Sequence, residues 1–89
     1  MARIDFNADE AAAMIEQGGS SDALFALAMV HCNGRHADQD LVAAHKWFNL
    51  AAMKGNARAR QYRQEIASDM TPEQIARAQR EARSWLNLH

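Results

Sequence analysis

The chain has 89 residues, of which 48% are hydrophobic and 24% are charged, and its formal net charge is −1. A chain of this length forms one domain and buries little more than about 60% of its unfolded surface, so we expect a small core. The single cysteine, Cys32, excludes an internal disulfide and fits a reducing compartment.

Membrane and export signals are not evident in the sequence. The longest apolar run, residues 23–30, is too short to cross a bilayer. Charged side chains interrupt residues 1–17, so we find no stretch of the signal-peptide type there. We therefore expect a cytoplasmic protein without membrane association.

The first two helices are predicted from capping residues and glycines. Asn7 and Glu10 have the spacing of a capping box and predict a helix over 7–17. Its buried residues are expected to be Ala11, Met14 and Ile15. Glycines at 18 and 19 end it, and Ser20 or Ser21 caps a second helix that runs to about residue 32. Asn33 and Gly34 end the second helix, because both tolerate the left-handed conformation at a helix C-terminus.

Three more helices follow in the same way. Asp38 or Asp40 begins the third, which ends at Gly55 after a lysine suited to the helix dipole. Asn56 caps the fourth, in which the apolar residues at helical spacing are Ala59, Tyr62, Ile66 and Met70. In the segment TPEQ, Thr71 takes the N-cap, followed by a proline at the first helical position and a glutamine at the capping-box position. The fifth helix is expected to bury Ile75, Ala78, Ala82 and Trp85.

These elements predict an all-α protein of about five helices. We find no segment with strand alternation, and the predicted connections are short, which favours antiparallel helical hairpins. We expect a single domain over 1–89. It would comprise an N-terminal capping helix in 1–19, a helical hairpin in 20–56 and a C-terminal helical pair in 57–89.

The second helix has two apolar stripes. The first contains Leu24, Leu27, Ala28 and His31, and the second contains Phe25, Met29 and Cys32. A helix that is apolar on two sides lies between neighbours or presents one side to a partner. We expect the first stripe to face the third helix. The second stripe is either covered by Met14 and Ile15, or it forms with Tyr62 an exposed patch that binds a protein partner.

The third helix carries small and large residues on one face: Ala44, Trp47, Phe48, Ala51 and Ala52. Alternation of small and large side chains lets neighbouring helices interdigitate, so this face is interpreted as a packing seam.

These residues are part of a longer pattern over 23–59 that resembles one repeat of the Sel-1-like repeat family, the tetratricopeptide-like helical hairpins. The matching positions are Ala23, Leu27, Gly34, Asp40, Ala44, Trp47, Ala51, Ala52, Gly55 and Ala59, with Phe48 at an aromatic position. Departures from the family pattern occur at residues 28, 31, 36, 37, 43 and 50. The resemblance implies a short α-solenoid fragment that serves as a protein–protein interaction or adaptor module. It also implies that the first helix of each hairpin, here the second and the fourth, lines the binding side.

One repeat does not bury both of its faces, since about three repeats are usually needed for stability. We expect the flanking helices to cap the two open ends, or else a second chain to cover one of them. A monomer is favoured over a homodimer.

Catalytic and metal-binding functions have less support in the sequence. His31, Cys32, His36 and His45 have metal-ligand chemistry, but the adjacent His31 and Cys32 point to different faces, so we expect no bound metal. A thiol nucleophile at Cys32 would need a base and an orienting group, and no orienting group is indicated. We expect neither a cofactor nor an enzymatic activity, and the alternative of a small metal-binding regulatory protein stays open.

Charge is distributed unevenly along the chain. Residues 1–53 hold three basic and seven acidic side chains, and residues 54–89 hold seven basic and four acidic ones. The basic residues of the predicted fourth and fifth helices are Arg58, Arg60, Arg63, Arg77, Arg80 and Arg83. Glu73 and Glu81 interrupt this series, and no aromatic residues interleave with it for base stacking. We expect solvated helix surfaces rather than nucleic-acid binding, which remains the other alternative.

Overall fold

The computed structural model describes residues 20–33 and 39–88, and all of the regular structure in these ranges is helical. The helices are α2 (Ser21–Asn33), α3 (Leu41–Met53), α4 (Ala57–Ala67) and α5 (Pro72–Leu88). The all-α prediction is therefore confirmed for this part of the chain. The predicted helix over 7–17, together with Gly34, His36 and Asp38, lies outside the described residues.

Side-chain caps start α3, α4 and α5. The carboxylate of Asp40 and the side-chain oxygen of Asn56 each accept a hydrogen bond of 3.0 Å from the amide three residues further on. Thr71 and Gln74 form a reciprocal pair: the Thr71 amide donates to Gln74 Oε1 at 2.9 Å, and the Gln74 amide donates to Thr71 Oγ1 at 3.1 Å. These bonds satisfy amide groups that no preceding turn of helix can satisfy. The predicted starts of these three helices are confirmed.

α3 ends at a glycine in the left-handed region, because Gly55 has φ +103°. The Gly55 amide donates to the Ala52 carbonyl at 3.0 Å, and the Asn56 amide donates to the Ala51 carbonyl at 3.0 Å. These are the two bonds of a Schellman motif. A β-carbon at Gly55 would meet no atom within 4 Å, so the glycine is needed for its backbone angle and not for space. This turn leads directly into the cap of α4.

The start of α3 is tied to the end of α2. The Asp40 amide donates to the His31 carbonyl at 3.1 Å, and Gln39 Nε2 donates to the Cys32 carbonyl at 2.8 Å. Carbonyl groups in the last turn of a helix have no partner within that helix, so these bonds satisfy two of them. They also hold α2 and α3 together as an antiparallel pair.

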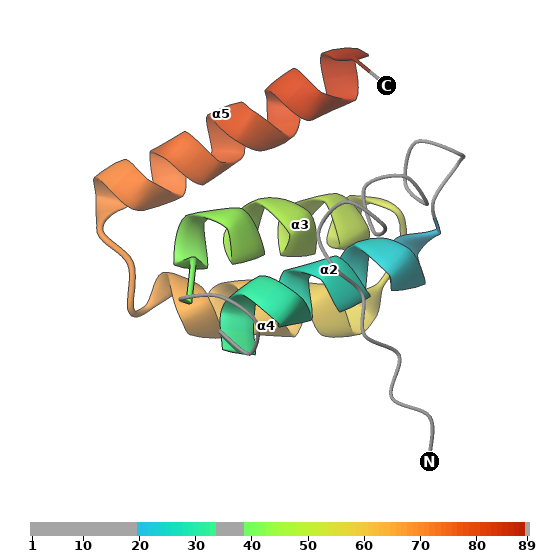
Figure 1. Ribbon diagram of the computed structural model, residues 1–89, viewed down its shortest axis with the longest axis horizontal. Coiled ribbons are helices and arrows are strands. Elements are labelled where there is room, and N and C mark those ends of the chain that lie inside the picture. The colour runs from blue at the N-terminus through green and yellow to red at the C-terminus, as the bar shows by residue number, and fades with distance from the viewer. Residues whose placement is uncertain (1–19, 34–38, 89) are drawn as a thin grey trace.

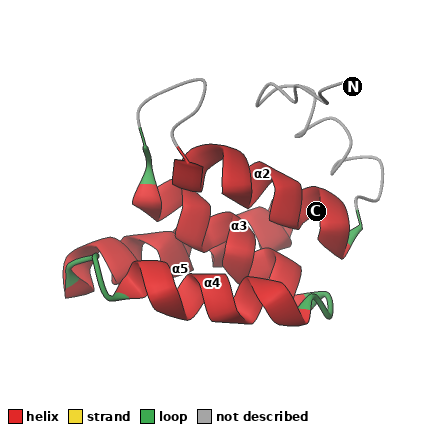
Figure 2. Cartoon of the chain, turned by 90° about the horizontal axis from the view of Figure 1, so that it is seen from below, coloured by secondary structure: helices red, strands yellow, loops and turns green. Residues whose placement is uncertain are grey.

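α3 is the central helix, and it packs against α2, α4 and α5. Figure 1 shows α2 and α4 below α3 and α5 inclined above it. Figure 2, seen from below, shows α2 and α4 on either side of α3. Because the chain reverses direction at each connection, α2 and α4 run parallel to each other and antiparallel to α3.

The core surrounds α3. Its buried residues on α3 are Ala44, His45, Trp47, Phe48, Leu50 and Ala51. The burial of Leu24, Leu27 and Ala28, with His31 half-buried, confirms that the first stripe of α2 is the packed one. Among the described residues, no helix combines the length and the apolar character needed to cross a membrane.

The C-terminal helical pair consists of α4 and α5, and α5 makes its main contacts with α3 rather than with α4. Ala78 and Ala82 are buried, and the Trp85 ring meets the Trp47 ring edge-on at a centroid distance of 5.8 Å. Ile75 is half-buried and packs against the core. α5 therefore docks through small residues, Ile75 and one aromatic contact on the side of α3 opposite α2 and α4. The total of five helices includes the one predicted over 7–17, so this total and the solenoid arrangement both stay predictions.

Candidate functional site

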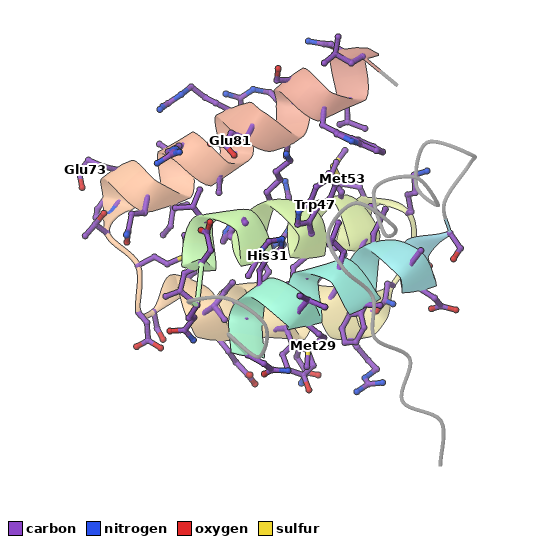
Figure 3. The ribbon with its side chains drawn as sticks, in the orientation of Figure 1. Met29, His31, Trp47, Met53, Glu73 and Glu81 are labelled. Atoms are coloured by element: carbon purple, nitrogen blue, oxygen red, sulfur yellow. The ribbon has the colours of Figure 1, made fainter. Side chains whose placement is uncertain are left out.

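The side of α2 and α4 that faces away from α5 carries the three residues predicted to bind a partner. Phe25 and Met29 lie on α2 and Tyr62 lies on α4, and all three are half-buried. We call the surface formed by Phe25, Met29, Tyr62, Arg58 and Glu65 the α2–α4 face. Figure 3 shows Met29 on this side, whereas Trp47 and Met53 lie on the side of α3 that faces α5.

Three aromatic rings from three helices meet under this face. The rings of Phe25 and Tyr62 are in edge-to-face contact, with centroids 5.5 Å apart and planes at 71°. Phe48 of α3 is fully buried beneath them; it stacks on Tyr62 at 5.5 Å and lies 5.7 Å from Phe25. Offset-stacked and edge-to-face pairs are favourable beyond the area they bury. Phe48 therefore packs beneath the partly exposed rings of Phe25 and Tyr62 and holds them in place.

Charged side chains border the face at its two ends. The guanidinium carbon of Arg58 lies 5.1 Å from the centroid of the Phe25 ring, which is a cation–π contact. At the other end Glu65 lies near Cys32. The pKa of the Cys32 thiol is raised, first by burial and then by the negative charge of Glu65. A raised pKa leaves less thiolate at neutral pH, which makes Cys32 a weak nucleophile.

A buried histidine lies on α3, three residues before Phe48. His45 is 4% exposed, and its Nδ1 atom makes no hydrogen bond within the described part of the chain. Burial lowers the pKa of His45, and the positive charge of the nearby Arg63 lowers it further. The Arg63 guanidinium donates to Asn49 Oδ1. The sequence indicates His45 only as a possible metal ligand. Its distances along the chain from Leu41, Phe48 and Ala52 nevertheless place it on a side of the helix that carries apolar residues, which is a signal for burial.

This arrangement predicts that stability falls in acid. The pKa of His45 is lower in the folded state than in the unfolded chain, so the unfolded state binds more protons below about pH 6.5. Stability is therefore unaffected by His45 above that value and decreases as the pH falls through it. The variant His45→Leu should be at least as stable near neutral pH, because a buried group without a partner is removed. Urea unfolding at several pH values checks this, and an equal acid slope for both proteins would contradict it.

The described candidate metal ligands, which are His31, Cys32 and His45, are not gathered into one site. Among the described residues, no group of three His, Cys, Asp or Glu side chains is placed to hold a metal ion. His36 lies outside the described residues, so the expectation of no bound metal stays a prediction. Whether Met14 and Ile15 cover Phe25 and Met29 also lies outside them.

The family-like positions have mainly structural roles. Trp47 and Phe48 are neighbours on α3, yet Trp47 contacts Trp85 of α5 while Phe48 contacts Phe25 and Tyr62. Asp40 is a cap and Gly55 is the turn. The remaining described positions are buried or half-buried: Ala23, Leu27, Ala44, Ala51, Ala52 and Ala59.

Comparison of the chain with protein-family models, with curated proteins and with solved structures finds no match. The resemblance to the Sel-1-like repeats therefore stays a prediction from the sequence.

Proposed function

We propose that the chain is a non-enzymatic protein-interaction module, of the adaptor type implied by its resemblance to Sel-1-like repeats, and that it binds a peptide or helix on the α2–α4 face. One observation carries the proposal. Phe25 and Tyr62 come from different helices, meet at 5.5 Å and remain partly exposed above the buried ring of Phe48. A rigid aromatic pair with a partly exposed surface is the composition of an interaction hot spot.

Met29 adds adaptability to this pair. It lies one helical turn after Phe25 on α2 and is half-buried. An unbranched methionine side chain adjusts to partners of different shape, whereas the ring pair supplies fixed contact area. The face is small, so we expect affinities on the order of 100 µM for a single short peptide.

The proposal predicts that Met29→Glu abolishes binding and leaves the fold intact. The variant places a charge on the apolar face, while glutamate is a good helix former and Met29 is not part of the fully buried core. The measurement is backbone amide NMR of the full chain, titrated with an amphipathic helical peptide of about 15 residues that carries a leucine stripe. Amide shifts are expected at residues 25, 29 and 62.

Met53→Glu is the matched control. Met53 is 61% exposed at the end of α3 and lies outside the face, so this variant should bind the peptide as the parent protein does. Shifts clustered around Met53, Leu86 and Leu88, the other exposed apolar residues, would contradict the proposal. Equal loss of peptide binding in Met29→Glu and Met53→Glu would also contradict the proposal. Phe25→Ala is a less selective test, because Phe25 also packs against Phe48.

A further inference from the structure

We infer that the occupant of the α2–α4 face is an amphipathic helix with a carboxylate at the Arg58 end of the face and a basic group at the Glu65 end. This inference rests on the proposed function, since it names the chemistry of the partner that the same face takes. It follows from three features: the line of residues along α4, the line along α2, and the unlike charges at the two ends.

Arg58, Tyr62 and Glu65 form one line along α4. Tyr62 follows Arg58 by four residues and precedes Glu65 by three, and both spacings place side chains on the same side of a helix. Seven residues of helix span about 10 Å, which is two turns. The two charges therefore border a strip about two turns long, with Tyr62 between them.

The second line runs along α2, from Phe25 through Met29 to Cys32, at the same spacing. Its two ends coincide with those of the first line, because Arg58 lies over Phe25 and α2 and α4 run parallel to each other. The face is thus an apolar strip with a cation at one end and an anion at the other.

Both end charges remain available to a partner. Arg58 and Glu65 are exposed, and in the described ranges neither forms a salt bridge with another side chain. Asp22 lies in the first turn of α2, three residues before Phe25, and it likewise makes no ion pair with Arg58 in those ranges. An apolar helix with unlike charges seven residues apart would place a carboxylate against Arg58, a basic group against Glu65 and apolar side chains against Phe25, Met29 and Tyr62.

The test uses two leucine-striped peptides of about 15 residues. One carries a glutamate and a lysine seven residues apart, and the other carries lysine at both of these positions. The full chain should prefer the glutamate–lysine peptide by about three- to tenfold, whichever way the bound helix runs, because only this peptide pairs with both end charges. The variant Arg58→Glu has a carboxylate at both ends of the face and should prefer the two-lysine peptide. It should also fold well, because it moves an acid into the first turn of α4.

The matched control is Arg80→Glu. It makes the same charge change at an exposed position of α5, away from the face, and should keep the preference of the parent protein. High salt should weaken the preference, since these charges are exposed. Equal affinity for both peptides, or a preference that Arg58→Glu leaves unchanged, would overturn the inference.

The failure of this inference and that of the proposed function are distinguishable. If both peptides bind equally and Met29→Glu still abolishes the binding, the face does bind peptides, but the inferred charges of the partner are wrong. If neither peptide binds the full chain, the proposed function fails, and the inference fails with it. Shifts that map to the α5 side of the molecule would have the same consequence.

Discussion

Phe48→Ala is expected to lower the free energy of unfolding by about 3–5 kcal/mol, which would make it the most destabilising of the predicted variants. Phe48 is fully buried and its ring contacts both Phe25 and Tyr62. Loss of the ring removes the free energy gained when it is transferred from water to the core. It also leaves a cavity between α2, α3 and α4. A domain of this size has a stability of about 4–13 kcal/mol, so the variant should be marginally folded.

Urea unfolding followed by circular dichroism measures this change. Phe48→Leu is the control, because it retains most of the apolar volume and should cost much less than the alanine variant. The two rings above the cavity should also lose their fixed positions, so peptide binding to the α2–α4 face should weaken in Phe48→Ala. A destabilisation below about 1 kcal/mol would show that the ring is not in the core.

Trp47→Ala is expected to cost about 3 kcal/mol and to act mainly on α5. Trp47 is 9% exposed, and its ring meets Trp85 on α5 at 5.8 Å. The rest of the α5 contact is made by Ile75, which is half-buried, and by small residues such as Ala78 and Ala82, which bury little area each. Without the Trp47 ring, α5 should separate from α3 before α2 and α4 do.

Hydrogen exchange distinguishes this local effect from global loss of stability. The amides of α5 should exchange faster in Trp47→Ala, while those of α2 and α4 keep most of their protection. Lys46→Ala is the control. The ammonium group of Lys46 lies 4.4 Å from the centroid of the Trp47 ring, and removing this cation–π contact should cost about 1 kcal/mol or less. Equal acceleration of exchange in all four described helices would contradict the prediction.

The sequence by itself determined where the helices begin and end. Asn56 and Thr71 are predicted as caps, and so is either Asp38 or Asp40. In the structure Asp40, Asn56 and Thr71 each accept a hydrogen bond from an amide three residues away. Gly55 is predicted as the end of α3 and has the positive φ angle that this role requires. Such signals are readable because the interacting groups lie within one turn of each other, so no distant part of the chain can move them apart.

The sequence also determined which stripe of α2 is packed, since Leu24, Leu27 and Ala28 are buried as predicted. It indicates Phe25, Met29 and Tyr62 as a group, and the contact between Phe25 and Tyr62 does bring two of them together. That these residues bind a partner remains a proposal.

Only the tertiary structure decided how the helices are arranged around α3. The sequence pattern places Trp47 and Phe48 in one seam, but they contact helices on opposite sides, α5 and the α2–α4 pair. The packing of α5 on α3 is likewise not evident from the sequence. The physical reason is that the hydrophobic effect is non-directional. Covering an apolar stripe lowers the free energy whichever helix covers it. That choice depends on the fit of side chains far apart in the sequence, which for this chain is decided at Phe48 and Trp47.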